Sequence, residues 1–118
     1  MGHIRYGSHP DRIEMEDRAL AHVKVVILAK LRRNEAFAFS WDTEASGGSG
    51  RDTIWIHPRV DLWFTFVGSR RPVLNRAWVD ALMLTANSVD GLRLVEEPPD
   101  TSTGSVPVQG SASDPINR

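Results

Sequence analysis

The stretch DRALAHVKVVILAKLRR, residues 17–33, decides the fold. Its apolar side chains recur at intervals of three and four residues, as one face of an α-helix requires. Asp17 is a good N-cap, and basic residues fill the last turn, where they complement the carbonyl end of a helix. We therefore predict a helix over residues 18–33. Its core-facing stripe consists of Leu20, Val23, Ile27 and Leu31.

Segments of alternating apolar and polar residues flank this helix. Residues 4–15 contain two such runs around a turn-rich centre, which predicts a β-hairpin. Residues 37–41, 53–57 and 62–67 are three further strands, and the glycine-rich residues 42–52 form a flexible connection between the first two. Because the connections are short, we expect these three strands to form an antiparallel meander.

A second helix follows the last of these strands. Pro72 suits the first turn of that helix, and residues 92–95 form a final strand. The order ββ-α-βββ-α-β predicts an α+β domain with two helices packed on a largely antiparallel sheet. The inward stripe of the second helix is predicted to consist of Leu74, Ala77, Trp78, Ala81 and Thr85.

The composition changes sharply at Pro98. Residues 98–118 are dominated by Pro, Ser, Gly, Thr and Asp, and their few apolar side chains are too sparse to repay the entropy of ordering the chain. We therefore predict one folded domain over residues 1–97 and a disordered tail over residues 98–118. The tail either has no role or binds a partner.

Charge and composition narrow the class of protein. The 118 residues include 14 basic and 15 acidic side chains, so the formal net charge of −1 creates no global attraction to nucleic acid. The chain contains no cysteine, which excludes disulfides and thiolate chemistry. No apolar run reaches the ~18 residues of a membrane span. We expect a cytoplasmic protein that does not enter a membrane.

No motif for catalysis or for a cofactor emerges. The glycine-rich run at 46–51 places Arg51 where a phosphate-binding loop needs lysine, and it joins two strands instead of a strand and a helix. The four histidines lack the spacing of a zinc site, and no serine has the context of a hydrolase nucleophile. We therefore expect no enzymatic activity, no cofactor, no metal and no catalytic residue.

Two surfaces carry more apolar character than a lone small domain needs. The face of the first helix opposite its core stripe is apolar enough to be buried, either within the monomer or against another chain. At least one tryptophan of the strands is expected on a sheet face that no helix covers, where it suits a binding anchor; the alternative is packing under the glycine-rich loop. The interface candidates are His22, Val25, Ala29, Trp55 and Trp63.

Arginine is the other candidate signal, with twelve arginines against two lysines. Arginine forks bind phosphate or carboxylate in a bidentate manner, and amide groups near a helix start favour anions. The alternative is surface ion pairing with Asp61 and Asp80. The candidates for contact with an anion or nucleic acid are Arg51, Arg59, Arg70, Arg71 and Arg76.

Seven short segments of the folded region form a recognisable series: residues 17–22, 29–33, 48–51, 54–58, 68–72, 74–78 and 86–88. Together they resemble a small actinobacterial and phage protein family of unknown function, whose members often carry the automatic label "ATP-dependent DNA ligase". A ligase of that kind needs a nucleophilic lysine in a Lys-x-Asp-Gly context, whereas Lys24 precedes Val-Val-Ile and Lys30 precedes Leu-Arg-Arg. The resemblance therefore implies association with such enzymes and not the activity.

The sequence thus favours a non-enzymatic binding module that contacts a protein, either a partner or a second copy of itself. The alternative is an accessory domain that binds nucleic acid, associated with DNA ligation or repair. In that alternative the arginines contact the phosphate backbone, and Trp55 or Trp63 stacks on bases.

Overall fold

The computed structural model describes residues 1–45 and 48–100 of the chain. The observed order of elements is the predicted ββ-α-βββ-α-β, which confirms the α+β class. The elements are β1 (Gly2–Tyr6), β2 (Arg12–Met15), α1 (Asp17–Arg32), β3 (Phe37–Ala45), β4 (Gly48–Ile56), β5 (Leu62–Thr65), α2 (Arg76–Ala86) and β6 (Leu92–Arg93).

The strands form two three-stranded sheets, in the orders β2-β1-β5 and β4-β3-β6. All pairings are antiparallel except that of β6 with β3. The predicted meander is wrong at its third strand, because β5 leaves β4 and pairs with β1, with Ile4 opposite Phe64. This pairing places Phe64 on the same sheet face as Ile4 and Ile13, where all three join the core.

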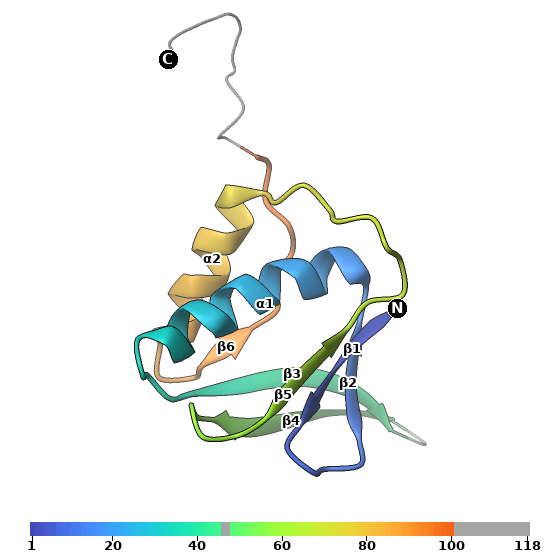
Figure 1. Cartoon of the computed structure of the whole chain (residues 1–118), viewed down its shortest axis with the longest axis vertical. Coiled ribbons are helices and arrows are strands. Elements are labelled where there is room, and N and C mark those ends of the chain that lie inside the picture. The colour runs from blue at the N-terminus through green and yellow to red at the C-terminus, as the bar shows by residue number, and fades with distance from the viewer. Residues whose placement is uncertain (46–47, 101–118) are drawn as a thin grey trace, which may run out of the picture.

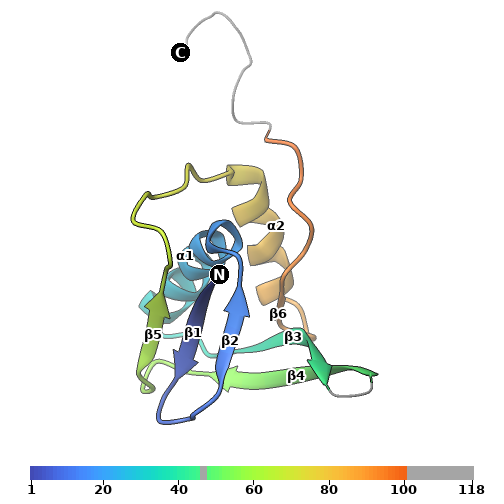
Figure 2. The same ribbon diagram turned by 90° about the vertical axis from the view of Figure 1, so that its right-hand side faces the viewer.

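The two sheets form a corner around α1. Both helices lie above β3 and β4 in Figure 1, and β5, β1 and β2 lie in front of α1 in Figure 2. Apolar side chains from both sheets and both helices therefore meet in one core. Its fully buried members include Ile4, Leu20, Val23, Ile27, Phe39, Ile56, Leu82 and Leu92.

The second apolar flank of α1 is covered by α2. Val26 and His22 are fully buried, and Lys30 is buried beside them, whereas Val25 and Ala29 remain half-buried. Burial within the monomer therefore accounts for most of the flank.

Helix α2 begins later than Pro72 suggested. Its N-cap is Asn75, whose side-chain oxygen accepts a hydrogen bond from the Trp78 amide. Its buried residues are Trp78, Leu82 and Ala86. Of the predicted stripe, Trp78 is therefore confirmed, Ala77, Ala81 and Thr85 are half-buried, and Leu74 lies before the helix and is exposed. The centre of the buried face lies at Leu82, which is outside the predicted stripe.

The β3–β4 hairpin extends through most of the segment predicted to be a flexible connection. Its register runs from Phe37 opposite Ile56 to Ala45 opposite Gly48, which leaves only residues 46–47 outside the described part. Residues 101–118, most of the predicted tail, also lie outside the described residues. Over the described residues, no helix has the length and apolar character needed to span a bilayer.

Candidate functional site

The predicted interface residue His22 is a structural histidine. Its ring is wholly buried between α1 and α2, so the prediction that it lies on a contact surface is wrong. Its Nδ1 lies 2.7 Å from the Arg18 carbonyl oxygen, and its Nε2 accepts a hydrogen bond of 2.8 Å from the Asn75 amide. The imidazole also packs on the Trp78 ring, with 4.5 Å between ring centroids. The spacing on α1 could not reveal this role, because the partners come from residues 75–78.

Asn75 connects this histidine to a surface ion pair. Its side-chain amide donates to Glu97 Oε2 at 2.9 Å and to the Pro98 carbonyl at 2.8 Å. Glu97 also pairs with the Arg18 guanidinium through two hydrogen bonds of 2.9 and 2.7 Å. Donation from Arg18 and then from Asn75 lowers the pKa of Glu97 from 4.5 to about 2. The start of α2 is thus held by a network that leaves no open site.

Asp17 has a similar structural role. It is the first residue of α1 instead of its N-cap, which is Glu16. Its carboxylate accepts hydrogen bonds from the Gly68 amide at 2.8 Å and the Val67 amide, and these bonds lower its pKa. Asp17 therefore fixes the segment that leaves β5 against the start of α1.

The two strand tryptophans are exposed where β4 passes into β5. Trp55 is 61% exposed and Trp63 is 66% exposed. Their strand ends adjoin, because the Tyr6 hydroxyl donates to the Trp55 carbonyl and Tyr6 pairs with Leu62. Arg59, in the connecting turn, is also exposed. We refer to Trp55, Arg59 and Trp63 as the tryptophan corner.

The two indoles lie on the outer faces of different sheets. Trp55 is opposite Ala38 in the sheet of β3 and β4, and Trp63 is opposite Arg5 in the sheet of β1 and β5. They are therefore not cross-strand neighbours. Both faces point away from the helices, which cover the inner faces (Figures 1 and 2).

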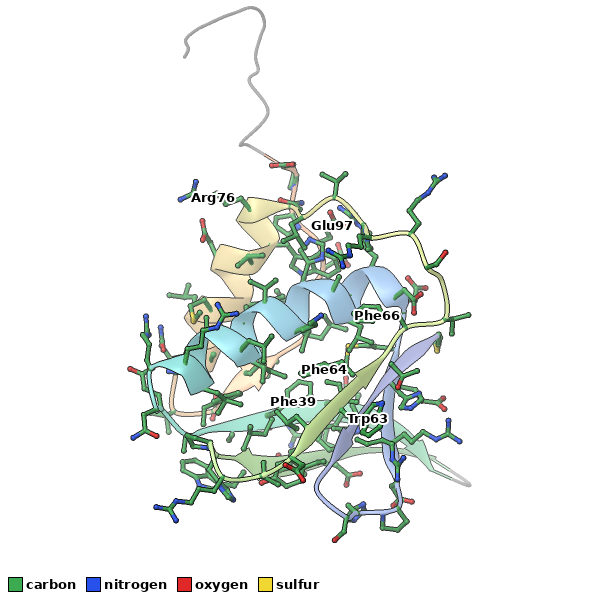
Figure 3. All side chains as sticks on the ribbon, in the orientation of Figure 1. Phe39, Trp63, Phe64, Phe66, Arg76 and Glu97 are labelled. Atoms are coloured by element: carbon green, nitrogen blue, oxygen red, sulfur yellow. The ribbon has the colours of Figure 1, made fainter. Side chains whose placement is uncertain are left out.

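The five candidate arginines do not come together in one patch. Arg51 lies on β4 opposite Asp42, and Arg59 lies in the β4–β5 turn. Arg70 and Arg71 lie in the loop between β5 and α2, which runs along the opposite side of the molecule from that turn in Figure 1. Arg76, the first residue of α2, is also well separated from Trp63 (Figure 3). The five arginines thus lie on β4, in the β4–β5 turn, in the loop before α2 and at the start of α2, and their role in contact with an anion stays a prediction.

The ion-pairing alternative is not observed for these arginines. All five are exposed, and no salt bridge among the described residues joins them to Asp61 or Asp80. The described salt bridges join Arg18 to Glu97, and Lys30 and Arg33 to Glu35.

Sequence reasoning missed a basic row beside Trp63. Arg12, Arg5 and Trp63 are direct cross-strand neighbours on β2, β1 and β5, and all three are exposed. Like charges directly opposite each other on a sheet repel, so this pair is unfavourable in the absence of an anion. The alternation of apolar and polar residues predicts which side chains of each strand face outward. It does not predict that β1 pairs with β5, because these strands are far apart in the sequence.

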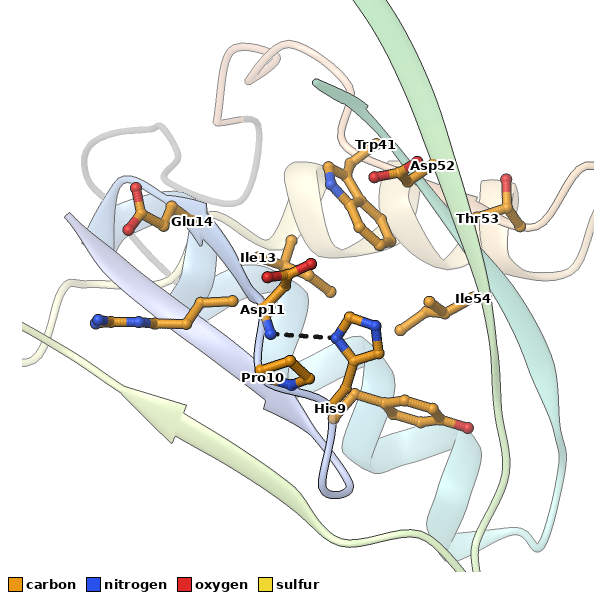
Figure 4. A pocket seen from close by; sticks show the side chains of 11 residues that line it. His9, Pro10, Asp11, Ile13, Glu14, Trp41, Asp52, Thr53 and Ile54 are labelled. Atoms are coloured by element: carbon orange, nitrogen blue, oxygen red, sulfur yellow. Dashed lines mark hydrogen bonds between the residues drawn. The ribbon is translucent and has the colours of Figure 1, made fainter. Parts of the chain in front are cut away.

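A groove lies along β2, the open edge of its sheet. It consists of two hollows of about 720 and 850 Å³ that share Ile13, Glu14, Trp41 and Thr53. We refer to this feature as the β2 groove. Figure 4 shows its first hollow, between the β1–β2 turn and the β3–β4 hairpin. Its remaining lining residues are Tyr6, His9, Pro10, Asp11, Arg12, Met15, Ala38, Phe39, Ser40, Asp42, Arg51, Asp52, Ile54, Val89, Asp90, Arg93 and Leu94.

The groove has no donor set for a metal. Within residues 1–45 and 48–100, no three histidine or carboxylate side chains gather closely enough to hold a metal ion. The Nδ1 atom of His9 accepts a hydrogen bond of 3.2 Å from the Asp11 amide, and this bond lies within the β1–β2 turn. The surface features that offer contacts are thus the tryptophan corner, the basic row and the β2 groove.

Residues 1–97 match the family described as Domain of unknown function (DUF7882). No curated protein and no solved structure matches the chain.

Proposed function

We propose that this chain, which belongs to the DUF7882 family, is a non-enzymatic module that binds a protein through the tryptophan corner. The observation that carries the proposal is the exposure of two large indoles, 61% for Trp55 and 66% for Trp63. The second apolar flank of α1, by contrast, is largely covered by α2. Burying exposed apolar surface is the main source of affinity between proteins. The bound protein is a partner or a second copy of the chain.

The composition of the corner supports this function. Tryptophan and arginine are the residue types most enriched among the few interface residues that carry binding energy. Here two tryptophans flank one exposed arginine, Arg59, in a tight turn. Both indoles are carried by paired strands, and the Val60 amide donates to the His57 carbonyl at 3.3 Å within the turn that joins these strands. A backbone ordered before binding lowers the entropy cost of association.

The test compares capture by three forms of the full chain. The wild type, the double variant Trp55→Ser with Trp63→Ser, and Leu84→Ser are immobilised at equal density and exposed to lysate of the source cells. Leu84 is a matched control because it is 75% exposed on α2, away from the corner. The proposal predicts a protein that the wild type and Leu84→Ser retain and the double variant loses at least tenfold.

Self-association is tested on the same three proteins by light scattering. A concentration-dependent rise in mass that only the double variant abolishes identifies a second copy as the partner. A monomer at every concentration, together with identical captured proteins for all three forms, contradicts the proposed function.

We infer a second candidate function, binding of single-stranded nucleic acid, from the row formed by Arg12, Arg5 and Trp63. A phosphate between the two guanidinium groups would relieve their repulsion, and the adjacent indole offers a stacking face for a base. Both would lie on one sheet face, about two strand spacings of ~4.8 Å across. The family resemblance adds a context for this function, DNA ligation or repair in actinobacteria or their phages.

Fluorescence anisotropy with labelled oligothymidine and oligouridine tests this candidate at low salt. We expect binding that weakens as salt rises and that falls at least tenfold in the double variant Arg5→Ala with Arg12→Ala. The control, Arg70→Ala with Arg71→Ala, removes the same charge from the loop before α2 and leaves binding unchanged. Equal losses in both variants, or no anisotropy change at all, contradict the assignment.

A further inference from the structure

The open edge of β2 has unused backbone hydrogen-bonding groups. A strand at the edge of a sheet presents alternate N–H and C=O groups to whatever lies beside it. β2 pairs only with β1, and within the described residues its amides and carbonyls form no backbone hydrogen bond to another element. This edge can therefore accept one further strand.

The β2 groove lies directly beside this edge. The first hollow is lined by Arg12, Ile13 and Glu14, and the second continues along Ile13, Glu14 and Met15. The far wall comes from β3 and β4 and, in the second hollow, from the α2–β6 connection and β6 with the residue after it. Each hollow lies within the range of about 300–1,000 Å³ that is typical of ligand sites. The groove therefore follows the whole of β2 and has room for extended chain.

The lining specifies the side chains that such a chain would need. Trp41 and Ile54 give the groove an apolar wall and are only half-buried. Asp11 and Asp52 are exposed and face the first hollow from opposite sides, the β1–β2 turn and β4 (Figure 4). Glu14 points away from them in the same view. The first hollow is lined by three carboxylates and one guanidinium, that of Arg12, so the excess of negative charge favours a cation between Asp11 and Asp52.

We propose that the β2 groove binds an extended segment of a partner protein that adds as a strand to β2. Its backbone pairs with residues 12–15, an apolar side chain lies against Trp41 and Ile54, and a lysine or arginine lies between Asp11 and Asp52. This mode of recognition takes affinity from main-chain hydrogen bonds and specificity from alternate side chains. The inference rests on the proposed function as a protein-binding module and names the conformation and charge of the segment bound.

The probe is a seven-residue peptide, acetylated and amidated, in which valine and lysine stand two residues apart so that both face the groove, with threonine at the positions between. It is titrated into the ¹⁵N-labelled full chain and followed by NMR. We expect the amide signals of residues 12–15 and the indole signal of Trp41 to shift and saturate. A peptide with glutamate in place of lysine should bind at least tenfold more weakly. Methylation of alternate backbone nitrogens of the lysine peptide should abolish binding, because it removes the donors that pair with β2.

A charge reversal tests the position of the lysine. Asp52→Lys should weaken the lysine peptide at least tenfold and strengthen the glutamate peptide. Asp80→Lys makes the same change of charge at an exposed site on α2 and should leave both affinities unchanged. Equal effects of the two variants would show nonspecific attraction and overturn the inference, as would shifts confined to Trp55 and Trp63 or an absence of shifts at millimolar peptide.

The peptide titration and the capture experiment test the β2 groove and the tryptophan corner independently of each other. If peptides leave β2 unperturbed while capture still depends on Trp55 and Trp63, the binding function stands and the groove inference falls. If β2 binds the lysine peptide while the corner variants capture the same proteins as the wild type, the groove inference stands and the corner falls.

Discussion

The region between the two helices buries polar side chains, whereas the outer faces of the two sheets expose large apolar ones. Between α1 and α2, the buried polar residues His22 and Lys30 have hydrogen-bond partners: His22 bonds Asn75, and Lys30 bonds Asn87 at 2.7 Å. On the outer sheet faces, Trp55 and Trp63 are large and apolar yet exposed. The contrast indicates that the interior between the helices helps to specify the fold, whereas the two exposed indoles are the residues on which the proposed binding function depends.

The segments that carry the family resemblance lie on both sides of this contrast. Residues 74–78 contain the α2 cap and the indole that packs on His22. Residues 29–33 and 86–88 contain Lys30 and Asn87, which bond to each other across the ends of the two helices. Residues 54–58, in contrast, contain the exposed Trp55.

The largest expected effect comes from Trp78, the buried indole of the helix side. Trp78→Ala removes a core side chain, its contact with His22 and its hydrogen bond to the Val95 carbonyl. We expect the free energy of unfolding to fall by about 3–5 kcal/mol, as for other large-to-small aromatic changes. Urea denaturation followed by circular dichroism measures this loss. A loss below about 1 kcal/mol would contradict the claim that the packing of Trp78 between the helices stabilises the fold.

A smaller loss is expected at the α2 cap. Asn75→Ala removes the side-chain bond to the Trp78 amide and both donations to Glu97 and Pro98. Loss of a cap and of partners for buried groups costs about 1–3 kcal/mol. Asn87→Ala, measured in the same way, should cost less, because Lys30 keeps its contact with Glu35 at 3.1 Å.

Low pH should reduce the free energy of unfolding through Glu97, which pairs with Arg18 and Asn75 at the start of α2. Because Arg18 and Asn75 lower the pKa of Glu97 from 4.5 to about 2, the folded state binds fewer protons than the unfolded state in this range. The stabilisation is present above about pH 4.5 and is lost as the pH falls toward 2. Denaturation measured across this window should show a shallower pH dependence for Glu97→Gln than for the wild type. Glu96→Gln, the neighbouring control, should keep the wild-type slope.

The sequence predicts the elements well and their neighbours poorly. Apolar periodicity places α1 and all six strands in order, because it depends on contacts between each element and the core. It misassigns β5 to β4, because short connections favour the nearest strand, whereas the packing of Phe64 beside Ile4 favours β1.

The candidate site is predictable only in part for the same reason. The exposure of the tryptophans follows from alternation along a single strand. The basic row of Arg5 and Arg12, and the carboxylates of Asp11 and Asp52 across one groove, depend on pairing and packing between distant segments. His22 shows the converse, a residue on an apparently free helix face that its own chain covers.

The most direct test of the contrast is the free energy of unfolding of the double variant Trp55→Ser with Trp63→Ser, measured by urea denaturation beside the wild type. Exposed substitutions away from structural features change stability by about 0.5 kcal/mol or less each. The account predicts a total change within about 1 kcal/mol and an unchanged dependence on urea. A loss of about 3 kcal/mol or more would mean that the two indoles hold the fold together and are not free for a partner.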